Sequence, residues 1–178
     1  ALYIFQNRYA LMGVFFQTLS ANSIAISNYT KAIELNKGDA YSYYQLGLLY
    51  KETGKNDMAE KVYSELLQIF PDHPDANYDL GYVYKEQGLS DIAVKQYQKA
   101  LEVDPMNAYA QYDIAYIYRQ EGNLETALKE YEKVLKIDPN HPYAYYDMGL
   151  IYEELGMKNK AEELFKIHQD RTDPNFIE

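Results

Sequence analysis

The sequence of 178 residues contains neither cysteine nor tryptophan, and basic residues are fewer than acidic ones. Without cysteine the chain can form no disulfide, no thiolate nucleophile and no cysteine-based metal site. With 17 Lys and Arg against 27 Asp and Glu, the formal net charge is −10. Such a chain repels phosphate backbones, so nucleic acid is not an expected partner. Basic or neutral ligands are favoured instead.

The sequence also lacks a long apolar run. Residues 1–19 form its most apolar stretch and carry one charge, Arg8. Polar residues interrupt this stretch, so no run of about 18 apolar residues exists and no membrane span is expected. It has neither the basic start nor the uniform apolar centre of a signal peptide. The compartment stays open, with the cytoplasm as the default. Because the chain begins at Ala1 without Met, we expect it to be cut from a longer protein.

What the sequence does contain is a pattern that recurs at a constant interval. A glycine recurs at four equally spaced positions, Gly54, Gly88, Gly122 and Gly156. Ser20 occupies the equivalent position in the first copy. An aromatic residue follows each of these positions at a fixed offset, as Tyr29, Tyr63, Tyr97, Tyr131 and Phe165. Apolar residues at helical spacing on both sides of the glycine predict two helices per period. Each helix has a narrow apolar stripe that only neighbouring copies can bury.

This period, of about 34 residues, and these residues resemble the tetratricopeptide repeat family, over about 170 of the 178 residues. The resemblance implies an all-α fold, a right-handed α-solenoid of stacked antiparallel helix pairs that forms a superhelix. A single domain is expected over residues 1–178. Its repeats would be residues 6–39, 40–73, 74–107, 108–141 and 142–175, with short tails at 1–5 and 176–178.

Small residues recur where the two helices of a pair should cross. Gly81 is expected to face Ala93, and Ala115 to face Ala127. Such residues allow helix axes to approach to about 8 Å, which gives them a structural role rather than a catalytic one.

The resemblance further implies that the first helix of each repeat lines an inner, concave surface. The candidate partner-binding residues on it are Tyr44, Gln45, Tyr78, Asp79, Tyr82, Lys85, Tyr112, Asp113, Tyr116, Arg119, Tyr146 and Asp147. Tyrosine offers a large rigid surface and a hydroxyl, while the aspartates would attract Lys or Arg of a peptide. Alternatively, some of the rings pack internally, and the basic residues neutralise nearby acids such as Asp79.

No active site is recognisable. Equivalent aspartates on neighbouring first helices should lie roughly 10 Å apart, whereas the ligands of one metal ion lie within about 2.6 Å of it. His73, His141 and His168 show no metal-ligand spacing. We therefore expect a non-catalytic protein without cofactor or metal. Some members of the family grip acidic chaperone tails with Lys, Asn and Arg at the inner positions. That set is absent, so such a tail is not an expected partner.

Two function classes remain. The first is a protein–protein interaction module that binds a partner peptide or helix in its Tyr/Asp-lined groove, with a basic or mixed apolar and basic partner. The alternative is a self-assembling scaffold, a homo-oligomer in which the apolar N-terminal helix docks on a neighbouring molecule. Leu11, Val14 and Phe15 would then form the docking face. In the simpler interpretation this helix is an ordinary first helix, with Met12, Gly13 and Phe16 facing inward.

Overall fold

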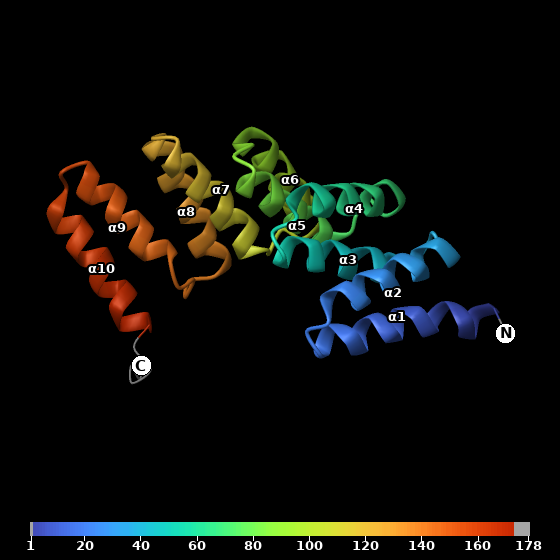
Figure 1. Ribbon diagram of the computed structural model, residues 1–178. Helices are drawn as coiled ribbons and strands as arrows, with labels where there is room; N and C mark the ends of the chain where they lie inside the picture. The colour runs from blue at the N-terminus through green and yellow to red at the C-terminus, as the bar shows by residue number, and fades with distance from the viewer. Residues whose placement is uncertain (1, 173–178) are drawn as a thin grey trace. The chain divides into compact units, whose positions relative to one another are not determined.

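The computed structural model describes residues 2–172, with side chains from Arg8 onward, and within that range every regular element is a helix. The chain divides into two compact units, residues 1–103 and residues 104–178. In the order of Figure 1 the helices are α1 (Leu2–Thr18), α2 (Asn22–Leu35), α3 (Ala40–Glu52), α4 (Asn56–Ile69), α5 (Pro74–Glu86), α6 (Ser90–Val103), α7 (Ala108–Gln120), α8 (Leu124–Ile137), α9 (Ala144–Glu154) and α10 (Lys158–Thr172). The predicted all-α class is confirmed.

Each repeat is one antiparallel helix pair. In the first unit the pairs are α1 with α2, α3 with α4 and α5 with α6; in the second unit they are α7 with α8 and α9 with α10. Within a unit the second helix of each pair also packs on the first helix of the next pair. The predicted solenoid of stacked helix pairs is therefore confirmed. A single domain over residues 1–178 stays a prediction. None of the described helices is both long and apolar enough to cross a membrane.

The turn inside each pair depends on one residue with a positive φ. The periodic glycines at these turns have φ between 70° and 76°, a region in which a side chain meets steric resistance. In the first repeat Ser20 adopts φ 55°. The register predicted this correspondence, because Ser20 occupies the position that glycine holds in the other four repeats.

A second glycine lets the two helices of a pair come together. A Cβ atom at Gly47 would lie 2.5 Å from the ring of Tyr63, and one at Gly81 would lie 2.8 Å from the ring of Tyr97. The nearest partner of Gly81 is thus Tyr97 rather than Ala93, which corrects the sequence-based expectation. The ring fills the space beside the helix backbone because no side chain stands in its way.

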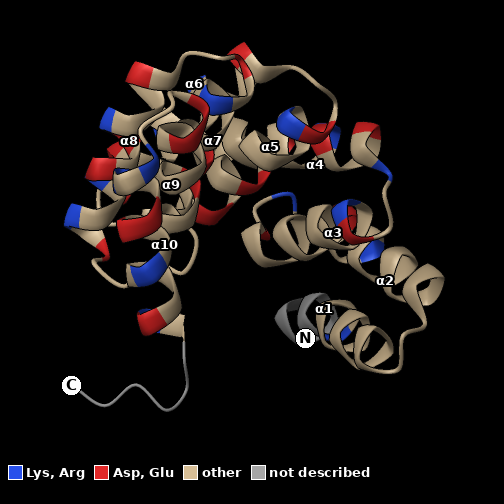
Figure 2. Cartoon of the chain, turned by 90° about the vertical axis from the view of Figure 1, so that its left-hand side faces the viewer, with Lys and Arg blue, Asp and Glu red and all other residues tan. Residues whose placement is uncertain are grey.

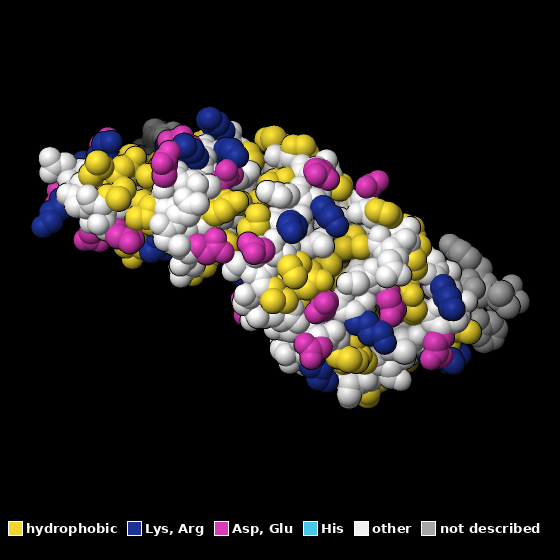
Figure 3. Space-filling view, turned by 90° about the horizontal axis from the view of Figure 1, so that it is seen from above, with side chains coloured by type: hydrophobic (Ala, Val, Ile, Leu, Met, Phe, Trp, Pro, Cys, Tyr) yellow, Lys and Arg dark blue, Asp and Glu magenta, His cyan; other side chains and the backbone are white. Residues whose placement is uncertain are grey.

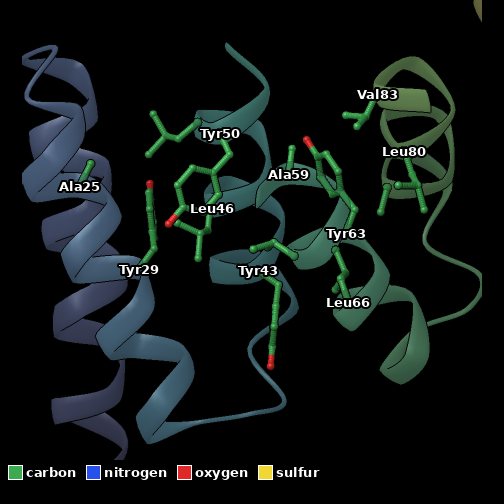
Figure 4. Packing of buried hydrophobic residues seen from close by; sticks show 13 residues of the cluster. Ala25, Tyr29, Tyr43, Leu46, Tyr50, Ala59, Tyr63, Leu66, Leu80 and Val83 are labelled. Atoms are coloured by element: carbon green, nitrogen blue, oxygen red, sulfur yellow. The ribbon is translucent and has the colours of Figure 1, made fainter. Parts of the chain in front are cut away.

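These rings form the centre of the core in the first unit. Figure 4 shows Tyr29 and Tyr63 pointing into the space between helices, among Leu46, Leu66 and Leu80. The side chains of Tyr29 and Tyr63 are completely buried. Each ring buries a large apolar area, while its hydroxyl needs a hydrogen-bond partner. That requirement leads to the polar residues of the first helices.

Candidate functional site

In the first unit a buried carboxylate joins two consecutive repeats. Asp79 on α5 is only 4% exposed, and its carboxylate accepts hydrogen bonds from Tyr44 Oη at 2.9 Å and from Tyr63 Oη at 3.3 Å. Lys51 Nζ forms an ion pair with the other carboxylate oxygen at 2.5 Å. Tyr44 and Lys51 lie two turns apart on α3, so both reach the same point on α5.

The second unit repeats this arrangement. Asp147 on α9 is 5% exposed; it accepts a hydrogen bond from Tyr112 Oη at 2.5 Å and pairs with Arg119 Nη1 at 3.1 Å. In both units the tyrosine precedes the aspartate by 35 residues and the cation precedes it by 28. One carboxylate, one hydroxyl and one cation therefore link α3 to α5 in the first unit and α7 to α9 in the second.

The electrostatics keep the hydroxyls of Tyr44 and Tyr112 protonated. Burial, together with the adjacent Asp79 carboxylate, raises the pKa of Tyr44. Burial and the hydrogen bond to Asp147 likewise raise the pKa of Tyr112. Both hydroxyls therefore stay protonated and donate to the aspartate carboxylates. A buried carboxylate is costly unless it is paired and hydrogen-bonded, and here both conditions are met.

Contrary to the sequence-based prediction, the aspartates do not line an open surface. Asp79, Asp113 and Asp147 are all less than 7% exposed. Asp79 and Asp147 face the preceding first helix of their own unit, which supplies the cation that pairs with each of them. The expectation of exposed aspartates is therefore wrong, and their direct contact with a partner stays a prediction. The alternative prediction was that the basic residues neutralise nearby acids, and this holds for Lys51, which neutralises Asp79.

The tyrosines of the predicted groove differ in accessibility. Tyr44, Tyr78, Tyr82, Tyr112 and Tyr116 are half-buried, as are Gln45, Lys85 and Arg119, whereas Tyr146 is 44% exposed. The ammonium groups of Lys51 and Lys85 both lie over the ring of Tyr82, at 5.4 and 4.8 Å from its centroid. Tyr116 stacks on Tyr112, with ring centroids 6.3 Å apart. These contacts hold the rings in place while leaving part of each accessible.

Sequence reasoning missed the histidines beside this network. His73 stacks on Tyr44 with ring centroids 5.2 Å apart, and His141 stacks on Tyr112 at 4.7 Å. His141 is only 2% exposed, although it lies in the connection between α8 and α9. A signal was present in the sequence, because each histidine follows its tyrosine at the same separation.

The buried His141 predicts a dependence of stability on pH. Burial lowers the pKa of His141, against the opposing effect of Asp138, Asp147 and Asp113. Below the ordinary histidine pKa of about 6.5 the unfolded chain binds a proton that the folded chain does not. We therefore expect the free energy of unfolding to fall as the pH is lowered from about 7 to about 5. Urea denaturation of the chain and of His141→Phe checks this. The variant keeps an aromatic ring, and its stability should fall less; parallel curves would contradict the assignment.

The N-terminal helix presents part of the expected docking face. Leu11 is 68% and Phe15 54% exposed, whereas Val14 is half-buried and packs against the core of the first unit. Phe16 also packs on that core, but Met12, which the simpler interpretation placed inward, is exposed. The described part of α1 carries hardly any charge (Figure 2). Leu11, Met12 and Phe15 therefore give α1 an exposed apolar patch.

Among the described residues no group of histidine, aspartate and glutamate side chains could hold a metal ion. The arrangement instead offers partly accessible aromatic rings whose orientation is set by buried hydrogen bonds. Surfaces of that kind suit recognition of another polypeptide.

Solved structures resemble the chain over nearly its whole length. A crystal structure of MamA is 24% identical in sequence; the aligned region covers 93% of this chain and 91% of the MamA chain, with a TM-score of 0.85. MamA from Desulfovibrio magneticus RS-1 is 19% identical, covers 96% of each chain and has a TM-score of 0.86. YrrB, described as a TPR protein with an unusual peptide-binding site, is 24% identical. The aligned region covers 94% of this chain and 86% of the YrrB chain, with a TM-score of 0.76. At these identities the likeness concerns the fold. A search of curated proteins gave no match to the sequence.

Family models match the repeats directly. Two models of the tetratricopeptide repeat match residues 38–106 and 96–129, and a model of the TPR repeat matches residues 115–156. The matches overlap and together run from residue 38 to residue 156. With the constant period, the stacked helix pairs and the likeness to TPR structures, they show that the chain belongs to the tetratricopeptide repeat family.

Proposed function

We propose that the chain is a non-catalytic protein–protein interaction module that binds a segment of a partner protein on the first-helix faces of its units. The observation that carries this proposal is the set of half-buried tyrosines fixed by buried carboxylates. Rings held in one orientation lose little conformational entropy when they bind, so more of their contact energy appears as affinity. Tyr82 and Tyr116 are the clearest candidates for direct contact, since each lies one turn beyond the buried aspartate.

The surface chemistry fits a polypeptide partner. On the face shown in Figure 3 hydrophobic side chains, a class that includes tyrosine, lie in patches between acidic and basic ones. Mixed surfaces with accessible aromatic rings are typical of protein interfaces. The net charge of −10 favours a basic or mixed apolar and basic segment.

The proposal is tested by selecting short random peptides against the immobilised chain and measuring the affinity of synthetic copies by fluorescence anisotropy. Replacing Tyr82 and Tyr116 together with serine should weaken binding by about tenfold or more, because loss of an anchoring aromatic ring costs upwards of about 1.4 kcal/mol. Far-ultraviolet circular dichroism should stay unchanged, since both rings are partly exposed.

A control is Ile92→Ser, which removes an accessible apolar side chain from α6, a second helix. It should leave the affinity unchanged. If no peptide is selected, or if the double tyrosine variant binds as tightly as the parent chain, the first-helix faces do not bind polypeptide segments.

A second candidate function rests on the exposed face of α1. Leu11 and Phe15 lie one turn apart and are more than half exposed, which suits docking on a second copy of the chain. Sedimentation velocity over a wide concentration range should then show a mass that rises with concentration and is insensitive to salt. Leu11→Ser/Phe15→Ser should be monomeric throughout. A monomeric parent chain, or a variant that still associates, would exclude this route.

A further inference from the structure

The second unit carries two strongly exposed tyrosines beside one buried histidine. Tyr109, in the first turn of α7, is 61% exposed, and Tyr143, which directly precedes α9, is 57% exposed. They are the most exposed tyrosines among the described side chains. The ring centroid of His141 lies 5.6 Å from that of Tyr109, 6.4 Å from that of Tyr143 and 4.7 Å from that of Tyr112. We call Tyr109, Tyr112 and Tyr143 the tyrosine platform.

The base of the tyrosine platform is rigid. The Tyr112 hydroxyl donates to Asp147, which Arg119 holds in turn. The ring of His141 is stacked on Tyr112, with 25° between the two planes. The backbone N–H of His141 donates to the carbonyl of Asp138, which fixes the connection. The exposed rings therefore stand against a preformed support, and binding to them requires little ordering of the chain.

Cations already lie over other tyrosine rings of this chain. Lys85 Nζ is 4.8 Å from the ring centroid of Tyr82, and the Arg171 guanidinium is 5.3 Å from that of Tyr145. In the part of the chain that the structure describes, no such cation lies over Tyr109 or Tyr143. The faces of these two rings are therefore available to a cation from outside the chain.

The local charge favours a positive ligand. The carboxylates of Asp138, Asp147 and Asp113 all act on His141, which lies between the rings of the platform. Arg119 neutralises Asp147, but Asp138 forms no ion pair among the described residues. A negative potential near aromatic faces attracts a cation and repels carboxylate or phosphate groups.

We propose that the tyrosine platform binds a cationic side chain of the partner segment, preferably arginine, by stacking it on Tyr109 and Tyr143. This inference rests on the proposed function and names the chemistry that the second unit recognises. Arginine is preferred to lysine because its planar guanidinium stacks on aromatic faces and is more weakly hydrated.

The first unit holds an incomplete counterpart. Two periods earlier in the sequence Tyr41, Tyr44 and His73 correspond to Tyr109, Tyr112 and His141, and the Tyr44–His73 stack recurs. Asp75 stands at the position that corresponds to Tyr143. The second exposed ring is therefore missing from this position, which makes Tyr41 a suitable control.

The test uses the peptides selected on the whole chain. Arginine should be enriched among them, and replacing the arginine by citrulline, its uncharged isostere, should weaken binding about tenfold. The double variant Tyr109→Leu/Tyr143→Leu should lower the affinity for the arginine-containing peptides by a similar factor. Its affinity for the citrulline peptides should equal that of the parent chain. Tyr109→Phe/Tyr143→Phe, which keeps the aromatic faces, should bind nearly as well as the parent chain, and so should Tyr41→Leu.

The outcomes separate this inference from the proposed function. Selected peptides that lack a cation, or whose affinity is unchanged by citrulline or by the double leucine variant, would overturn the cation site and leave the interaction module intact. Equal losses in the phenylalanine and leucine variants would assign the binding to the hydroxyls and also overturn it. Failure to select any peptide would contradict the proposed function itself.

Discussion

Replacing Asp147 with alanine should lower the free energy of unfolding of the second unit by about 3 kcal/mol, since removing one partner of a buried ion pair typically costs about 3–5 kcal/mol. The cost arises because the remaining charge stays behind without compensation. The Asp147 side chain is 7% exposed, whereas that of Arg119 is 22% exposed. Arg119 therefore regains some water in the variant, which places the expected loss at the lower end of the range. The hydroxyl of Tyr112 loses its acceptor as well.

Hydrogen exchange of the α7 and α9 amides measures this loss locally, and urea denaturation measures it for the chain. The matched control is Glu125→Ala, which breaks the ion pair between Glu125 and Lys129, whose side chains are 82% and 65% exposed. Water screens such a pair, so no measurable change is expected. The double variant Asp147→Ala/Arg119→Ala should cost less than the sum of its single changes. Additive losses would mean that the pair contributes little to the link between the two repeats.

The second large effect is expected at Tyr63. This side chain is completely buried, and its ring packs against the backbone of α3 at Gly47. Tyr63→Ala should cost about 3–5 kcal/mol, as for other large aromatic residues truncated in a core. The loss combines the removed apolar area with the cavity that remains, and Asp79 loses one of its hydrogen-bond donors.

The space left by the Tyr63 ring allows a sharper experiment. In the parent chain Gly47→Leu should be destabilising, because a Cβ atom there would lie 2.5 Å from the ring. In the Tyr63→Ala background the leucine should instead fill the cavity and recover part of the stability. Urea denaturation of the four proteins gives the coupling. If Gly47→Leu has the same effect in both backgrounds, the ring and the glycine do not share this space.

The sequence predicted the repeats because the physical constraints on them are local. A positive φ selects glycine at the turn, and the same register located Ser20, whose φ is 55°. The aromatic ring opposite Gly47 has an equivalent at the same offset in every copy, so both partners of that contact follow the same period. Periodicity also located the tyrosines of the first helices, since residues one and two turns apart share a helix face.

The environment of the aspartates could not be predicted in the same way. Helical periodicity gives the face on which Asp79 lies, but not whether the neighbouring first helix supplies groups to cover it. Whether Asp79 is covered depends on Lys51, 28 residues earlier, and on Tyr44, 35 residues earlier. The periodicity within a single helix does not relate residues that far apart in the sequence. His141 was missed for a related reason: a residue in a short connection is usually exposed, but here the ring of Tyr112 provides a surface to stack on.

The separations of 28 and 35 residues have a consequence for how the length of such a chain can change. Asp79 and Asp147 each depend on a hydroxyl and a cation from the preceding copy of the repeat. Duplication or loss of the third or fourth copy, residues 74–107 or 108–141, places an equivalent tyrosine and basic residue before each aspartate again, whereas loss of residues 40–73 would place Ala10 and Gln17 before Asp79. Any other insertion or deletion within a first helix rotates the carboxylate away from both and leaves a buried charge without a counterion. The network thus allows arrays of this sequence to lengthen or shorten only by complete copies.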